Sequence, residues 1–88
     1  MAKKTPTMTE TDFLKSVASV AEDGGWLVYH TYDSRRSQAG FPDLVMTRAG
    51  RTIFAELKSQ KGRIKAAQQN WLDELGKTKG LEGFLWRP

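Results

Sequence analysis

The sequence predicts a mixed α/β domain in which one sheet of four strands packs between two helices. Three observations predict this class. The 88 residues suit a single domain spanning 1–88. Two segments repeat apolar residues at helical spacing, and four short segments are rich in aromatic or β-branched residues. Their order is helix, three strands, helix, strand, so a hairpin precedes one strand–helix–strand crossover and the sheet is mixed.

The first helix is expected over 10–23, after a polar segment, 1–7, that we expect to be flexible. Thr9 and Asp12 fit a capped start, and Gly24-Gly25 fits a stop. The residues expected on its inner face are Phe13, Leu14, Val17, Val20 and Ala21.

The remaining elements follow from local composition. A first strand is expected over 26–32, and strands over 43–47 and 52–58 flank the turn "RAGR", where Gly50 is available for a positive φ. The second helix is expected over 64–77, and "GLEGFLWRP" predicts a short final strand. The inner stripe of the second helix is expected to be Ile64, Trp71, Leu72 and Leu75.

Bulk composition limits the function classes. A net charge of +4 and a pI near 9.6 permit a polyanionic partner. The absence of cysteine excludes a disulfide framework, a thiolate metal site and a cysteine nucleophile. No apolar run approaches membrane-span length, and the basic start is not followed by an apolar segment, so an intracellular protein without membrane contact is expected.

Charge is distributed unevenly between residues 35 and 65. This segment carries eight basic residues but only two acids, Asp43 and Glu56, which lie in or beside apolar strands. Side chains alternate along a strand, so Glu56 and Lys58 share one face. A hairpin centred on 48–51 then brings Asp43 opposite Glu56. Two adjacent carboxylates repel each other, and a hard divalent cation removes that conflict.

Two helical residues extend the pattern. Glu10 continues the apolar stripe of the first helix at its start, and Gln68 lies within the stripe of the second. Each feature has a simpler interpretation: Glu56 and Lys58 as a solvated ion pair, Asp43 as turn chemistry, Glu10 as a helix-dipole partner, and Gln68 as a core amide. The combination favours a site, because burying several polar groups without partners is costly.

These residues resemble a known family. Pro42-Asp43 followed by Glu56-Leu57-Lys58 resembles the PD-(D/E)xK nuclease superfamily. The stretches "SQAGFPDLVM", "FAELKSQKGRIKAAQQNWLDEL" and "LWRP" look like the VRR-NUC domain, the virus-type replication-repair nuclease, over 10–88. The resemblance implies a restriction-endonuclease-like αβββαβ core. Small stand-alone members are typically phage or prophage proteins, which implies a location in the host cytoplasm.

The resemblance also implies roles for individual residues. Asp43 and Glu56 would ligate a catalytic Mg²⁺ or Mn²⁺ with the backbone carbonyl of Leu57, and Lys58 would position the attacking water. Glu10 would orient metal-bound water or help hold a second ion. Two further positions match the family pattern, namely Gln68 at the start of the second helix and Gly40 before Pro-Asp. Lys65-Ala66 departs from it, because the family often has Ser-Pro or Thr-Pro there.

The function expected is metal-dependent hydrolysis of DNA phosphodiesters, selective for DNA structure. The phosphate-contact candidates are Arg35, Arg36, Arg48, Lys61, Arg63 and Lys65. The resemblance further suggests a homodimeric resolvase of four-way (Holliday) junctions, with an interface drawn from Trp26, Phe41, Phe84 or Trp86. The alternatives are a flap or nicking nuclease, a non-catalytic nucleic-acid binder, and a structural or inhibitory phage protein. Tyr29 and Tyr32 are expected to pack, and His30 is not needed for the chemistry.

Overall fold

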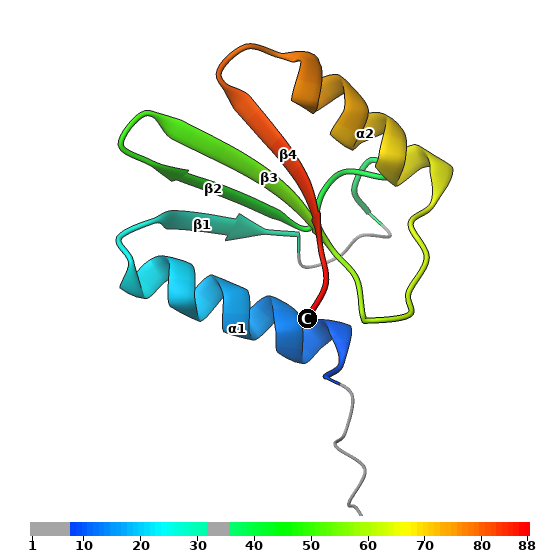
Figure 1. Cartoon of the computed structure of the whole chain (residues 1–88), viewed down its shortest axis with the longest axis horizontal. Helices are drawn as coiled ribbons and strands as arrows, with labels where there is room; N and C mark the ends of the chain where they lie inside the picture. Colours follow the sequence, from blue (N-terminus) through cyan, green and yellow to red (C-terminus); the bar gives the residue numbers. More distant parts are fainter. Residues whose placement is uncertain (1–7, 32–35) are drawn as a thin grey trace, which may run out of the picture.

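The computed structural model describes residues 8–31 and 36–88. The elements follow the predicted order: α1 (Glu10–Asp23), β1 (Leu27–His30), β2 (Leu44–Arg48), β3 (Arg51–Leu57), α2 (Ala66–Lys77) and β4 (Leu81–Trp86) (Figure 1). The predicted α/β class is therefore confirmed. Most bounds agree with expectation within about two residues, the usual uncertainty at element ends.

The strands form one mixed sheet in the order β1-β2-β3-β4. The pairs β1/β2 and β2/β3 are antiparallel, and β3/β4 is parallel. The β2–β3 hairpin closes with Arg48 opposite Arg51, as the sequence predicts. Ala49 and Gly50 both have positive φ, 49° and 82°, which is the pattern of a type I′ turn.

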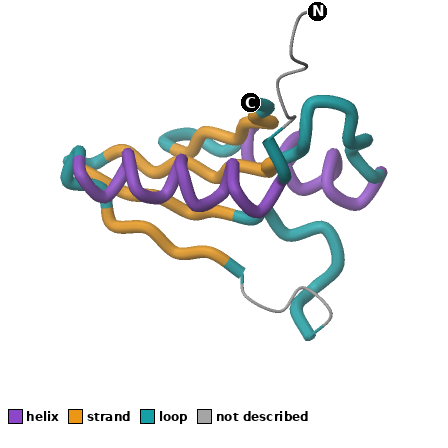
Figure 2. The backbone as a smooth tube through the Cα atoms, turned by 90° about the horizontal axis from the view of Figure 1, so that it is seen from below, coloured by secondary structure: helices purple, strands orange, loops and turns teal. Residues whose placement is uncertain are grey.

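The helices cover opposite faces of the sheet, which lies between them in Figure 1. Leu44, Ala55 and Leu57 form the core on one face, where α1 packs against them with Phe13 and other half-buried residues. On the other face the ring of Phe41 meets the edges of Phe54 and of Trp71 from α2. Figure 2 shows α1 running alongside the strands. Strand alternation thus separates an apolar α1 face from the α2 face that carries Glu56.

The helix termini show how local sequence sets the element bounds. Thr9 Oγ1 accepts the Asp12 N–H at 3.1 Å, which satisfies an amide that has no helical partner. At α2 the N-cap is Lys65, whose side chain has no acceptor atom. The Gln68 side chain takes over this role, because its Oε1 accepts the Lys65 N–H at 2.8 Å. The departure from Ser-Pro at this point is therefore compensated within the first turn.

Three details of the predicted helices are wrong. The second helix begins at Ala66, so Ile64 lies in the preceding loop, because Lys65 is extended (ψ 156°). Val20 is 72% exposed, because it lies at the rim of an open groove where no strand or helix covers it. Glu10 is also exposed and does not continue a buried stripe, because it is the first residue of α1.

Two glycines provide a matched test of close backbone approach. Gly40 and Gly50 have nearly equal φ, 87° and 82°. A Cβ on Gly40 would lie 2.6 Å from the carbonyl group of Ala67, whereas one on Gly50 meets nothing within 4 Å. We expect Gly50→Ala to cost about 1 kcal/mol, the penalty for a left-handed residue, and Gly40→Ala about 1–3 kcal/mol more. Urea unfolding measures both, and equal losses would contradict the contact with α2.

Candidate active site

The site is centred on Glu56 in β3. Its side chain is 2% exposed. The Gln68 amide from α2 donates to Glu56 Oε1 at 3.1 Å, and Lys58 Nζ lies 3.7 Å from the same oxygen. Glu56 Oε2 is buried and has no hydrogen-bond partner among the described residues. A buried carboxylate oxygen without a partner is costly, so it indicates a missing ligand or a bound proton.

Asp43 approaches Glu56 from the start of β2. Leu44 pairs with Ala55, so continuing this register places Asp43 opposite Glu56. Asp43 Oδ2 accepts the Leu57 N–H at 2.9 Å, and its backbone carbonyl accepts the Thr31 N–H. Asp43 is therefore held by the neighbouring strands on both sides. One oxygen of its carboxylate remains available for another partner.

The two carboxylates change each other's ionisation. Burial raises the pKa of Glu56 to about 8 from an ordinary 4.5. Asp43 raises the pKa further, both as an acceptor for the Glu56 proton and by repulsion. Lys58 lowers the pKa of Glu56, and repulsion from Glu10 raises it. Glu10 is thus near enough to influence the site although it is exposed.

This donor set fits a hard divalent cation. Such an ion would satisfy the unpartnered Glu56 Oε2 and remove the repulsion between Glu56 and Asp43. Residues 8–31 and 36–88 contain no group of three or more His, Cys, Asp or Glu side chains that could hold a metal. The remaining ligands would be backbone carbonyl and water, a mixture that Mg²⁺ commonly uses. The Leu57 carbonyl stays a prediction as one of these ligands.

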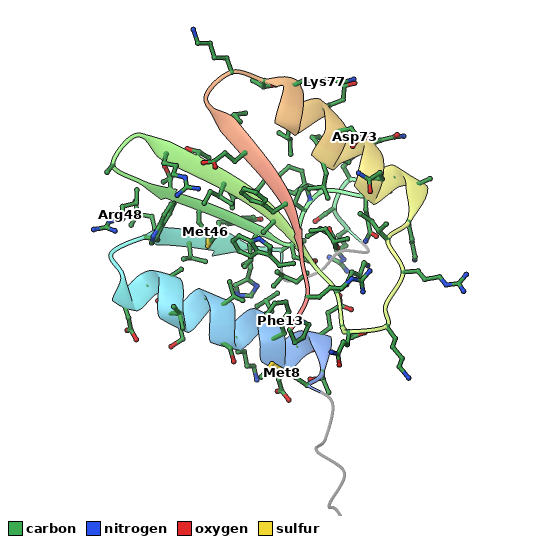
Figure 3. The ribbon with its side chains drawn as sticks, viewed as in Figure 1. Met8, Phe13, Met46, Arg48, Asp73 and Lys77 are labelled. Carbon is green, nitrogen blue, oxygen red and sulfur yellow. The ribbon has the colours of Figure 1, made fainter. Side chains whose placement is uncertain are left out.

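The predicted phosphate contacts do not all lie together. Lys61, Arg63 and Lys65 are exposed in the loop that leads from Lys58 to α2. Arg36 is exposed in the loop before Asp43, and Arg35 lies outside the described residues. Arg48 lies at the far end of the β2–β3 hairpin, as Figure 3 shows, so the length of β2 separates it from Asp43.

Two features were not anticipated from the sequence. Tyr29 is 61% exposed, contrary to the expectation that it packs. It lies on the α2 side of β1, and α2 covers β3 and β4 instead.

The other feature is Arg87, whose guanidinium binds backbone carbonyls of the loop after Lys58. The only signal for it was the closing "LWRP". His30 is half-buried, and Tyr32 lies outside the described residues.

A separate apolar groove lies on the α1 face and holds none of the predicted site residues. Its volume is about 460 Å³. The residues that line it include Phe13, Val17, Val20, Trp26, Met46, Ile53 and Trp86. Because its lining is almost entirely apolar, the groove suits packing rather than phosphate chemistry.

The fold and the site together define a class of protein: a mixed α/β domain with two acids, a lysine and an amide gathered beside the end of its third strand. The sequence model of the VRR-NUC domain matches residues 5–85. The chain belongs to the VRR-NUC domain family, and this places it among the nucleases, which implies DNA binding.

The comparison with solved structures agrees on the fold. A structure described as a VRR_NUC domain protein superposes with a TM-score of 0.71 at 18% identity. The match covers 93% of this chain and 79% of that chain. A search of curated proteins found no match. Among the described residues, no helix is long and apolar enough to cross a membrane.

The pKa of Glu56 predicts an unusual dependence of stability on pH. Folded Glu56 keeps its proton up to about pH 8, whereas the unfolded chain releases it near 4.5. The free energy of unfolding should therefore fall as pH rises through this window in the presence of chelator, by up to a few kcal/mol. Glu56→Gln should remove this slope and be more stable than the native chain at pH 8. Urea unfolding across pH measures the effect.

The control for this experiment is Glu74→Gln, which changes an exposed carboxylate of α2. It is expected to keep the native slope. A native chain whose stability does not change between pH 5 and 8 in chelator would contradict the buried, protonated Glu56.

Proposed function

We propose that the chain is a metal-dependent DNA endonuclease of the PD-(D/E)xK type, with residues 1–88 acting as one nuclease domain. The observation that carries the proposal is the buried Glu56 Oε2, which lacks a partner while Asp43 and Lys58 flank the same carboxyl group. Membership of a nuclease family supports it. In a purely structural role this oxygen would depend on a proton shared with Asp43, whereas a cation held by both carboxylates would satisfy it in their ionised forms.

In this proposal Asp43, Glu56 and the Leu57 carbonyl hold Mg²⁺ or Mn²⁺. The bound ion supplies Lewis-acid stabilisation of negative charge on the scissile phosphate. Lys58 Nζ, already 3.7 Å from Glu56 Oε1, donates to the attacking water and orients it. Gln68 fixes Glu56 through its amide. Glu10, at the start of α1, accepts a hydrogen bond from water at the site.

The exposed basic residues supply the electrostatic part of DNA binding. Lys61, Arg63 and Lys65 follow Lys58 directly, so phosphates bound there lie next to the proposed chemistry. Arg35 and Arg36 are proposed to extend this contact, and Arg48 to contribute at most a distant one. Sequence-independent backbone contacts favour selection by DNA shape, with four-way junctions as the proposed substrate. Consistent with the family resemblance, a phage or prophage origin and an intracellular location belong to this proposal.

A cleavage assay tests the mechanism. The native chain, Asp43→Asn and Lys58→Met are incubated with four-way junction, flap, duplex and single-stranded DNA in Mg²⁺, Mn²⁺ or chelator. Asp43→Asn keeps an acceptor for the Leu57 N–H, and Lys58→Met keeps the buried stem, so both variants should fold. We expect metal-dependent cleavage that each substitution reduces about 100-fold or more, a typical loss when one catalytic group is removed.

The DNA substrates separate the parts of this proposal. Cleavage in chelator, or full activity of Lys58→Met, would refute the mechanism. Preference for flaps, or equal cleavage of linear duplex, would refute only the junction assignment and favour a flap or nicking nuclease. Binding without any cleavage would favour a non-catalytic nucleic-acid binder.

We further propose that two copies associate through the apolar groove. Trp26, Trp86 and the exposed Val20 line it, and the Phe84 ring stacks on Trp86 at 5.7 Å between centroids. Phe41 is a weaker interface candidate, because it already packs between Phe54 and Trp71. A chain of this size buries a small core, so covering the groove adds apolar burial that one copy lacks.

Two substitutions on one helix test the dimer. Val20→Glu places a charge in the groove, whereas Ser19→Glu adds the same charge at an exposed neighbouring position. We expect Val20→Glu to weaken dimerisation at least about tenfold, because it buries an unpaired charge, and Ser19→Glu to change it little. Sedimentation equilibrium measures the dissociation constant. A native chain that stays monomeric at every concentration would refute the dimer.

A further inference from the structure

Arg87, directly after β4, makes an unusual set of backbone contacts. Its Nη1 donates to the carbonyl oxygens of Ser59 at 2.8 Å and Gly62 at 2.6 Å, and the Gln60 carbonyl lies 3.4 Å away. These carbonyls belong to the loop between Lys58 and α2. One guanidinium therefore ties the end of β4 to the loop that leaves β3.

The loop needs this cation for its shape. The Gly62 N–H donates to the Ser59 carbonyl at 3.2 Å, which closes a turn over 59–62. In this turn the carbonyl dipoles of Ser59, Gln60 and Gly62 converge on one point, where they repel each other unless a positive donor lies between them. The turn and the Arg87 guanidinium thus stabilise each other. Removing the guanidinium would leave converging dipoles that a neutral side chain cannot offset.

The turn also lies close to Lys58. A Cβ on Gly62 would lie 3.5 Å from Lys58 Cδ, so Gly62 faces the aliphatic stem of this lysine at short range. The Lys58 N–H donates to the carbonyl of Trp86 at 3.1 Å. Trp86 directly precedes Arg87. Lys58 is 8% exposed. Its backbone is held by β4, and its stem lies beside the turn that Arg87 contacts.

We propose that Arg87 is a positioning residue, which clamps the 59–62 turn against Lys58 and so keeps the Lys58 ammonium beside Glu56. The clamp itself stands on the geometry alone, whereas its consequence for cleavage rests on the proposed nuclease function. The same clamp sets the path of the loop that presents Lys61, Arg63 and Lys65. Arg87 thereby acts on the reaction through Lys58 without contact with the reacting atoms.

A pair of arginine substitutions tests the clamp without using DNA. Arg87→Met removes the guanidinium but keeps an apolar stem. Arg51→Met is the matched control, because the Arg51 guanidinium is also hydrogen-bonded, to Glu82, but at the opposite end of β3. Hydrogen–deuterium exchange reports on residues 59–65. Amine acylation followed by mass spectrometry reports on Lys58, with the exposed Lys77 and Lys79 as internal references.

We expect Arg87→Met to speed both exchange in 59–65 and acylation of Lys58 about tenfold, because the turn opens more often. Arg51→Met should change neither. Unchanged exchange and acylation in Arg87→Met would overturn the proposal. If Arg87→Met does not fold, Arg87→Lys decides the point. The lysine ammonium is one bond shorter than the reach of Nη1, the nitrogen that makes all three contacts, and should give an intermediate increase. Native values in a folded Arg87→Lys would then overturn it.

Cleavage kinetics test the catalytic consequence. Arg87→Met should lower kcat about tenfold or more with little change in KM, and Arg87→Lys should recover part of the loss. A rise in KM at unchanged kcat would overturn the positioning role and indicate direct phosphate contact. If the native chain cleaves no DNA, the proposed nuclease function fails, and the exchange and acylation results alone decide whether Arg87 positions Lys58.

Discussion

The burial of one carboxyl group, that of Glu56, governs the organisation of this molecule. Glu56 as a whole is 1% exposed and faces a second acid across the β2–β3 ladder, and one of its carboxylate oxygens has no hydrogen-bond partner among residues 8–31 and 36–88. The surrounding elements position its neighbours. Asp43 directly precedes β2, and Gln68 lies in α2. Lys58 directly follows β3, and its N–H donates to a carbonyl of β4. A bound proton at lower pH, or the cation proposed above, would relieve the unfavourable pairing of these two acids.

The two faces of the sheet carry different kinds of side chain. Leu44, Ala55 and Leu57 point toward α1 and form the apolar core, while Glu56 and Lys58 alternate with them and point toward α2. Core residues and candidate site residues therefore alternate along one segment, β3 and the residue that follows it. A shift of one residue in its register would exchange the two sets, burying the wrong side chains on both faces. The type I′ turn at Ala49 and Gly50 helps to prevent that shift.

Much of this arrangement was predictable because it depends on local patterns. Alternation along β3 and the short hairpin turn place Asp43 opposite Glu56 without any knowledge of distant contacts. The exposure of Val20 and Tyr29 was not predictable in this way, because it depends on where α1 and α2 leave the sheet uncovered. Arg87 was missed for a related reason. Its partners are backbone carbonyls 25 to 28 positions earlier in the chain, and a carbonyl has no sequence signature.

The parallel pairing of β3 with β4 has a consequence for the order of folding. Asp43 and Glu56 meet through a local hairpin that forms early, but Lys58 gains its backbone anchor only when β4 crosses over and pairs with β3. During folding the two acids are thus expected to meet before the lysine is fixed. In the proposed nuclease, all three groups would be in place only once β4 has paired with β3.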